Sequence, residues 1–264
     1  MCKVCAYNIY VGKKPQQTII QKLYLYFMSQ DSIKEMFSIG AHIGYGKTRR
    51  HPTAQPFIFT TKQRTDLIDL TKTAVQLEKA EAFLQELGKG KKNILLVSTK
   101  AEGRSFIKDA AEKLDMPYIN ERWIGGTLTN FGEINKRISL LRDLLAKKEK
   151  NELVFKTKKE LLMIEREIER LTKRFGGLVS LMGMPDAIIV IDPRHEDIAI
   201  LEAASKGIAV IALANTDCNM KDAEYMITAN DTAPTSIKYF VQRLVRAYEE
   251  GREESVSHTA TPTV

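Results

Sequence analysis

The sequence contains few residues of the kinds that build disulfide-rich, secreted or membrane-spanning proteins. It has three cysteines in 264 residues, and two of them, Cys2 and Cys5, lie at the N-terminus. Three cysteines do not form a disulfide framework, so we expect a reducing, cytoplasmic location. The apolar runs are short and interrupted by charge, which excludes a transmembrane helix. The first residues also lack the cleavage pattern of a secretory signal peptide.

The sequence also lacks a strong signature of an enzyme site. No Gly-x-Gly-x-x-Gly fingerprint follows an apolar strand, as a dinucleotide-binding site would require. Residues 46–48 (Gly-Lys-Thr) match the end of a phosphate-binding loop, but Pro52 and Pro56 follow where a helix should begin. Cys2 and Cys5 have metal-ligand spacing, yet a closed zinc site needs two further ligands. We therefore expect no metal and no cofactor.

One group of potential acid–base residues remains. Asp192, His195 and Glu196 follow the apolar stretch 187–191, where α/β enzymes often place catalytic groups. No nucleophile motif lies nearby. A strand-to-helix turn with Pro193 and with acids at the helix start accounts for the same residues without catalysis.

Positive charge is unevenly distributed along the chain. The net charge is +7, yet residues 178–264 hold seven Lys or Arg against thirteen Asp or Glu. The stretch 47–64 holds five Lys or Arg and no acid. Flexible basic side chains on a loop punctuated by glycine and proline suit the phosphates of a folded RNA. A solvated loop is the alternative.

Short apolar strands alternate with helices along most of the chain. Continuously apolar stretches predict buried parallel strands at 94–97, 187–191 and 208–213, with shorter strands at 118–119 and 225–227. Helical patterns occupy about 33–39, 73–87, 103–114, 198–205 and 235–249. This alternation predicts a three-layer α/β fold, Rossmann- or flavodoxin-like, with a mostly parallel sheet.

A helical pattern of another kind interrupts this alternation. Two apolar stripes recur at coiled-coil spacing: Ile134, Ile138, Leu141 and Leu145, then Leu161, Ile164, Ile168, Leu171 and Phe175. They predict an antiparallel coiled-coil hairpin inserted over residues 133–175. The α/β domain then comprises residues 28–132 and 176–250. Residues 1–27 form an N-terminal extension, and residues 251–264 a disordered tail.

The stretch 117–131 has the most unusual composition. It holds the only tryptophan, Trp123, followed by a Gly-Gly pair at 125–126. Glycines permit positive φ and close backbone approach. Nearby side chains offer polar groups, namely Arg122, Thr127, Thr129 and Asn130, the last of which could cap the following helix. We expect a shaped loop that holds a ligand, with Trp123 as a packing anchor rather than a base-stacking platform.

Several motifs also occur in a characteristic order. They are His42-x-Gly44 with Thr48-Arg49-Arg50, Ile68-Asp69-Leu70-x-Lys72-Thr73, the 117–131 stretch, Pro185-Asp186-Ala187, Asp192-Pro193-Arg194, Glu202-Ala203, Gly207-Ile208, Thr216-x-Cys218 and Asn230-Asp231. In this combination the chain resembles the bacterial-type small-subunit ribosomal protein number two family, from about Asp31 to Tyr248. Residues 1–27 lie outside the resemblance.

The resemblance implies a non-catalytic, structural constituent of the small ribosomal subunit. It implies a Rossmann-like body that carries an inserted coiled-coil hairpin and docks on small-subunit rRNA. It also implies that the protein supports translation by helping to recruit ribosomal protein number one. The RNA-facing residues would be Lys47, Arg49, Arg50, His51, Lys62, Arg64, Lys100, Arg104, Arg122, Thr127, Thr129 and Asn130. A Rossmann-like enzyme that acts on a nucleotide or a phosphorylated metabolite is the alternative.

The chain departs from the family pattern at two places. Arg50 and His51 stand where many members have tryptophan and asparagine, and we expect the change to add charge at an RNA contact. Asn219 and Met220 stand where the family has aspartate and proline, which removes the proline expected in that turn.

Overall fold

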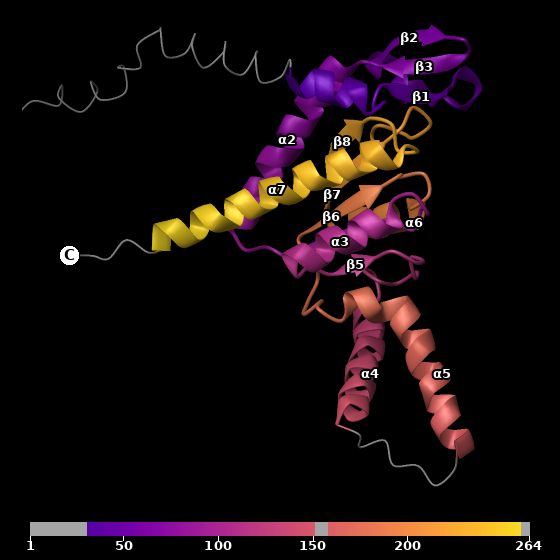
Figure 1. The fold of residues 1–264 in the computed structure, drawn as a ribbon, viewed down its shortest axis with the longest axis vertical. Coiled ribbons are helices and arrows are strands. Elements are labelled where there is room, and N and C mark those ends of the chain that lie inside the picture. Colours follow the sequence, from indigo (N-terminus) through magenta and orange to yellow (C-terminus); the bar gives the residue numbers. More distant parts are fainter. Residues whose placement is uncertain (1–30, 151–157, 260–264) are drawn as a thin grey trace, which may run out of the picture.

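Two β-sheets and their covering helices make up the part of the chain that the computed structural model describes, residues 31–150 and 158–259 (Figure 1). A helix at residues 31–38 precedes the first strand. The elements that follow are β1 (Ile43–Gly46), η1 (Lys47–Arg49), η2 (Pro52–Phe57), β2 (Ile58–Lys62), β3 (Thr65–Ile68), α2 (Leu70–Lys89), β4 (Ile94–Val97), α3 (Arg104–Leu114), β5 (Tyr118–Ile119), α4 (Phe131–Glu149), α5 (Lys158–Phe175), η3 (Gly176–Leu178), β6 (Ala187–Ile191), α6 (Asp197–Lys206), β7 (Ala209–Ala214), β8 (Tyr225–Thr228) and α7 (Pro234–Thr259).

The larger sheet confirms the predicted parallel α/β body. Its five strands run in the order β5-β4-β6-β7-β8, and every neighbouring pair is parallel. Numbered within the sheet this is the order 2-1-3-4-5, which is the flavodoxin-like arrangement. All five strands coincide with stretches that the sequence predicts as strands, because buried parallel strands are apolar on both faces.

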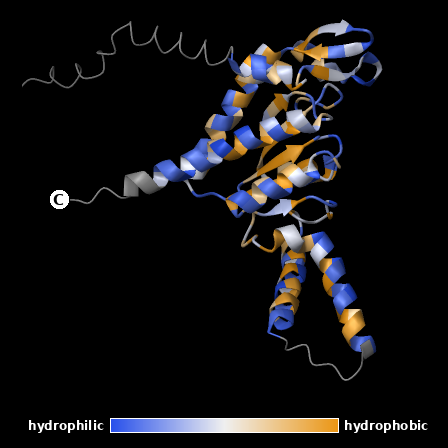
Figure 2. Cartoon of the chain, viewed as in Figure 1, coloured by the Kyte–Doolittle hydropathy of each residue, from blue (hydrophilic) through white to orange (hydrophobic). Residues whose placement is uncertain are grey.

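Successive side chains of each strand point to opposite faces of the large sheet and pack into two separate hydrophobic cores. Leu96 and Ile189 pack against α2, α3 and α7, while Leu95 and Ile188 pack against α6 and the inner ends of α4 and α5. Helices thus cover both faces of the sheet, and apolar strands lie at the centre of the body (Figure 2). The three-layer fold follows directly from this division.

The smaller sheet is a feature that the sequence pattern predicts only in part. Its strands are antiparallel and run in the order β1-β3-β2. Apolar residues at 57–59 and 67–70 indicate a turn between them near Arg64, but β1 is missed because Gly44 and Gly46 interrupt its pattern. This sheet lies at one end of the molecule, and α4 and α5 extend from the other (Figure 1).

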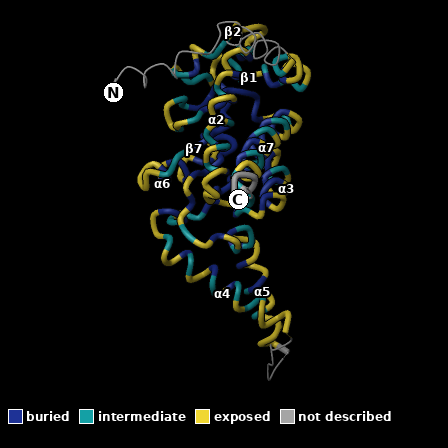
Figure 3. Tube along the Cα trace, turned by 90° about the vertical axis from the view of Figure 1, so that its left-hand side faces the viewer, coloured by how far each residue is buried: buried dark blue, intermediate teal, exposed yellow. Residues whose placement is uncertain are grey.

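The two predicted insertion helices are present as α4 and α5. Their inner halves bury Ile134, Ile138 and Leu141 of α4 with Leu171 and Phe175 of α5. The outer half of α5 is exposed, and both helices project away from the body (Figure 3). Residues 151–157, which join them, lie outside the described part. A coiled-coil pairing along the whole length therefore stays a prediction.

The C-terminal helix is longer than the sequence predicts. A disordered tail is expected from residue 251, whereas α7 continues to Thr259. Gly251 is buried against α2, where a Cβ atom would lie 2.1 Å from the carbonyl oxygen of Gln85. Close packing of α7 on α2 thus holds a segment whose composition alone predicts disorder. Within residues 31–150 and 158–259, none of the helices has the length and apolarity to span a bilayer.

Candidate nucleic-acid interface

The crevice where flavodoxin-like folds usually bind a ligand is filled by side chains of this protein. That crevice lies at the carboxyl ends of the strands, at the switch point between β4 and β6. Lys100, which follows β4, places its Nζ 3.0 Å from Oδ2 of Asp192 and 3.0 Å from Oδ2 of Asp231. Asn215 donates to the other oxygen of Asp231 over 2.9 Å. These four residues bridge the ends of β4, β6, β7 and β8.

Burial and close charges set the protonation of this cluster. Burial lowers the pKa of Lys100, but Asp231 and Asp192 outweigh it and hold that pKa above its ordinary value. Burial, then the charge of Asp192, raises the pKa of Asp231 to about 6. Burial also acts to raise the pKa of Asp192, yet Lys100 holds it below its ordinary value. The Lys100 side chain is only 14% exposed, so we revise its predicted RNA-facing role to a structural one.

The potential acid–base residues are not assembled as a catalytic set. Asp192 is bound to Lys100, and the buried Glu196 accepts hydrogen bonds from the Thr99 amide at 2.8 Å and hydroxyl at 2.5 Å. The exposed His195 donates its backbone N–H to Asp192. The turn with Pro193 leads into α6, as expected of a structural strand-to-helix connection.

Metal-ligating side chains do not gather anywhere in the described residues, where no cluster of three or more His, Cys, Asp or Glu could hold an ion. Cys2 and Cys5 lie outside those residues.

The Trp123 loop binds a carboxylate of the protein itself. Oε1 of Glu202 on α6 accepts from the Trp123 indole N–H at 3.2 Å and from the Gly126 amide at 2.7 Å. Its Oε2 accepts from the amides of Leu128 at 2.9 Å and Thr129 at 3.1 Å, and from the Thr129 hydroxyl at 3.1 Å. The sequence predicts a loop shaped around RNA, whereas the group that the loop holds in the structure is the internal carboxylate of Glu202.

Backbone conformation explains the glycine in this loop. Gly126 has φ +92°, a region that side-chain-bearing residues rarely adopt. The turn aims the amides of Gly126, Leu128 and Thr129 at Glu202. Burial raises the pKa of Glu202, but the loop amides outweigh it and hold that pKa below its ordinary value. The sequence argument names Glu202 only within the Glu202-Ala203 motif and misses its role as the acceptor for this loop. An acid in the middle of a mostly apolar helix is a usable signal for such a role.

The other loop residues divide into buried and exposed. Trp123 is 7% exposed and belongs to the core beside α4 and α6, which confirms it as a packing anchor. Thr127 is fully buried and donates to the carbonyl of Ile124 at 2.6 Å, so we revise its predicted RNA-facing role. Asn130 stands at the N-cap position of α4 without a capping hydrogen bond from its side chain.

Arg50 is also committed to the protein interior. Its guanidinium forms a bidentate ion pair with Asp66, which is fully buried, and also donates to Gln55 and Thr61. Burial raises the pKa of Asp66, but the bonds from Arg50 and Thr61 outweigh it and hold that pKa below its ordinary value. The Arg50 side chain is 14% exposed. The charge expected to be added at an RNA contact is therefore neutralised inside the small sheet.

The two places where the chain departs from the family pattern, Arg50-His51 and Asn219-Met220, lie next to each other in the structure. His51 donates its backbone N–H to the carbonyl of Thr216 at 2.8 Å. The Thr53 hydroxyl donates to Asn219 at 3.2 Å and accepts from the Met220 amide at 2.9 Å. The turn that lacks the family's proline is thus held by hydrogen bonds to the arm at residues 47–57.

Two exposed arginines share one buried carboxylate at the edge of the large sheet. Arg49 and Arg194 both contact Oδ2 of Asp217, at 3.3 Å and 3.1 Å, and their side chains are 55% and 57% exposed. The Arg49 guanidinium also lies over the ring of Tyr45, 4.2 Å from its centroid. These arginines line a hollow of about 870 Å³ between the arm and α6. Asp197 and Asp222 lie on the same rim, so the hollow is mixed in charge.

The hairpin of β2 and β3 presents further cations at its tip. Lys62 and Arg64 are exposed, as is Lys47 on the neighbouring chain segment, whose amide bonds to the Arg64 carbonyl. Gln63 and Arg64 form the two-residue turn with φ of 50° and 65°. Such turns favour asparagine and glycine, so two bulky residues here carry backbone strain.

The remaining predicted cations lie near the β4 and β5 ends of the large sheet. Arg104 donates through Nε to the Thr99 carbonyl at 2.9 Å and is 43% exposed. Arg122 is exposed beside the buried Trp123. The predicted set therefore does not form one patch: the arm and hairpin gather at one end, while Arg104 and Arg122 lie toward α4.

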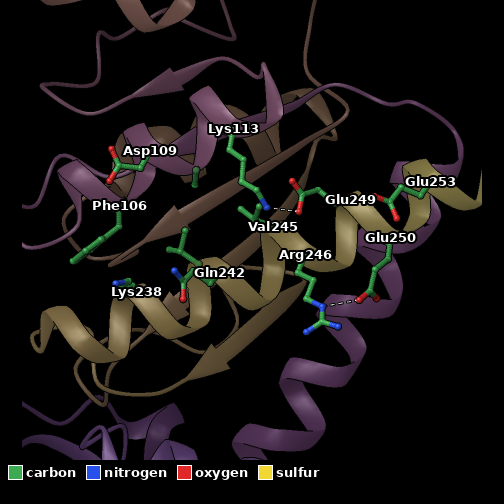
Figure 4. Close-up of a pocket in the computed structure, with 12 residues that line it drawn as sticks. Phe106, Asp109, Lys113, Lys238, Gln242, Val245, Arg246, Glu249, Glu250 and Glu253 are labelled. Carbon is green, nitrogen blue, oxygen red and sulfur yellow. Dashed lines mark hydrogen bonds and ion pairs between the residues drawn. The ribbon is translucent and has the colours of Figure 1, made fainter.

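A second hollow lies between α3 and α7, on another face (Figure 4). It measures about 690 Å³. Charged side chains on its walls are paired with one another: Lys113 with Glu249 at 2.6 Å, and Arg246 with Glu250 at 2.8 Å. Its floor of Val241 and Val245 is already buried. Nothing in it converges on a ligand.

Comparisons with known proteins agree with the motifs. Residues 36–251 match the model of a family described as ribosomal protein S2. The chain is 38% identical over 226 residues to the small ribosomal subunit protein uS2 of Coprothermobacter proteolyticus, covering 86% of this chain and 84% of that protein. The family consists of structural ribosomal proteins rather than enzymes. The chain belongs to the ribosomal protein S2 family.

Proposed function

We propose that this structural protein of the small ribosomal subunit binds small-subunit rRNA through the exposed cations of its arm and β2–β3 hairpin. The observation that carries the proposal is the acid-free stretch 47–64, which contributes Lys47, Arg49, Lys62 and Arg64 to the surface at one end of the molecule. Phosphate contacts by such side chains supply most of the sequence-independent affinity for RNA.

The internal bonds of the site support a rigid platform for these contacts. Arg50 fixes the small sheet through Asp66, and Asp217 holds Arg49 and Arg194 together. Preordered cations lose less side-chain freedom on binding than free ones, because Arg49 and Arg194 are already oriented. Paired guanidinium groups also match the geometry of phosphate oxygens. Arg104, Arg122 and the Thr129–Asn130 end of the loop form a second, smaller contact in this proposal.

Filter binding to small-subunit rRNA at several salt concentrations tests the proposal. Arg49→Ala combined with Arg64→Ala should lower affinity and reduce the salt dependence by about two phosphate contacts. Lys206→Ala, an exposed cation at the far end of α6, is the matched control and should bind like the parent. An unchanged salt slope in the double variant would remove the arm and hairpin from the interface.

We further propose that the projecting helices contact protein neighbours, including ribosomal protein number one. The outer half of α5 exposes Leu161, Leu162 and Met163 at 38%, 46% and 61%. Exposed apolar side chains on a largely charged helix suit a protein partner better than phosphates. Together with the apolar stripes of α4 and α5, they also favour a coiled-coil hairpin as the form in which this surface is presented.

Reconstitution of small subunits tests the protein contact. Leu162→Ser with Met163→Ser should leave rRNA binding intact and reduce retention of ribosomal protein number one on washed subunits. Glu165→Ser, an exposed α5 residue of the opposite character, serves as the control. Full retention by the apolar variant would show that this end of α5 is not the contact.

A further inference from the structure

The β2–β3 hairpin exposes an aromatic ring that the phosphate contacts do not use. Phe59 is 76% exposed, the most exposed aromatic among the large hydrophobic side chains of the described residues. It lies on β2, one of the two edge strands of the small sheet. Exposed rings of this size lose the stabilisation that burial would give, so Phe59 is a candidate for contact with a partner.

A β-bulge directs this ring outward. Ile58 pairs with Ile68 and Thr60 pairs with Leu67, so two steps along β2 match one step along β3. Phe59 is the extra residue. Bulges locally break the pairing and re-aim a side chain, and they are frequent near functional sites. The ring is therefore presented by the backbone and is not a loosely packed core residue.

The surroundings of Phe59 select the partner. The same hairpin ends in the strained turn at Gln63 and Arg64, next to Lys62. No acid lies between residues 47 and 64. The hairpin thus carries an exposed ring three residues before Lys62 and five residues before Arg64. Aromatic rings and cations on one surface suit unpaired nucleotides, because bases stack on the ring while the cations hold the backbone. A protein neighbour would need no such excess of positive charge.

We propose that Phe59 stacks on an unpaired base of small-subunit rRNA, so that the hairpin recognises a loop or bulge and not a continuous helix. The inference rests on the rRNA-binding function proposed above and names the kind of RNA structure involved. It assigns two distinct parts to one hairpin. Phe59 supplies stacking that is independent of salt, and Arg64 supplies a phosphate contact that depends on it.

Filter binding of the full chain to small-subunit rRNA separates these parts. Phe59→Ala should lower the affinity for rRNA roughly tenfold with an unchanged salt slope. Phe59→Trp keeps an aromatic ring and should bind rRNA like the parent. Arg64→Ala should reduce the slope by about one. Thr60→Ala, the neighbouring exposed position on β2, is the matched control. Thermal unfolding confirms that each variant folds, which the exposure of Phe59 predicts.

Fluorescence of the Phe59→Trp variant gives a second readout, because the natural Trp123 is buried. Emission from the new ring should be quenched by rRNA with an unpaired target and not by an RNA duplex. Parent-like binding of Phe59→Ala overturns the inference, while loss of binding in Arg64→Ala would leave the proposed function standing. If Phe59→Ala binds naked rRNA normally but enters subunits poorly, the ring contacts a protein and the inference fails.

Discussion

Glu202→Ala is the substitution that most sharply tests how the Trp123 loop is held. The change removes the acceptor of five hydrogen bonds. Two of the donors, the Trp123 indole N–H and the Leu128 amide, belong to residues that are 7% and 1% exposed. A buried donor without an acceptor costs about 1–3 kcal/mol. Water can reach the exposed Thr129 in place of the carboxylate, so only the two buried donors are counted. Together they predict a loss of about 4 kcal/mol.

Urea unfolding of the isolated protein measures this loss. Because Trp123 is the only tryptophan, its emission reports on the same loop, and a red shift in the folded variant is expected. Lys206→Ala on the same helix is the control and should change stability by less than about 0.5 kcal/mol. A Glu202→Ala protein with parental stability and emission would refute the assignment of Glu202 as the loop's ligand.

The pKa of Glu202 makes a linked prediction about pH. Its folded value lies below the ordinary value of 4.5, so its contribution is complete above that pH and is lost as the pH falls through the folded value. Glu202→Gln should therefore unfold more easily at pH 7, and its stability should fall less than that of the parent when the pH is lowered below 4.5. Parallel pH profiles for the two proteins would contradict this reasoning.

Three further substitutions test other parts of the account by urea unfolding. Arg50→Ala leaves the buried Asp66 carboxylate unpaired and should cost about 3 kcal/mol; a loss below 1 kcal/mol would contradict the structural role of Arg50. Lys100→Met leaves two buried carboxylates facing each other and should destabilise more at pH 7 than at pH 5; an equal loss at both would count against it. Gln63→Asn with Arg64→Gly relieves the turn and should add about 1 kcal/mol while weakening rRNA binding; unchanged rRNA affinity would contradict the hairpin contact.

The sequence predicts the large sheet well and the small sheet poorly, for a physical reason. Strands such as β4 and β6 are buried on both faces, and an unbroken apolar run records that environment. Strand β1 carries two glycines and only partial burial, so its pairing with β3 is decided by tertiary contacts. The same holds for the start of the 251–259 segment of α7, where Gly251 lies against Gln85 and Glu254 pairs with Lys89 of α2.

Residue types at the site are predicted more reliably than their roles. A lysine after a parallel strand, or threonines beside a Gly-Gly pair, can bind a phosphate ligand. The same residues can equally well bind a carboxylate of the protein itself. The choice depends on Asp192, Asp231 and Glu202, which lie 73 to 131 positions from their partners in sequence. Such long-range pairings leave no local pattern. Lys62 and Arg64 are exposed and have no such carboxylate partner within residues 31–150 and 158–259, so composition alone identifies them.

Cross-linking of rRNA to protein within assembled small subunits, followed by mass spectrometry, tests the central claim most directly. The account predicts cross-links at the arm and hairpin, in the segment from Lys47 to Arg64, and none at Lys100 or Thr127, which are committed to internal bonds. Cross-links confined to the α3–α7 face, with none between Lys47 and Arg64, would contradict it.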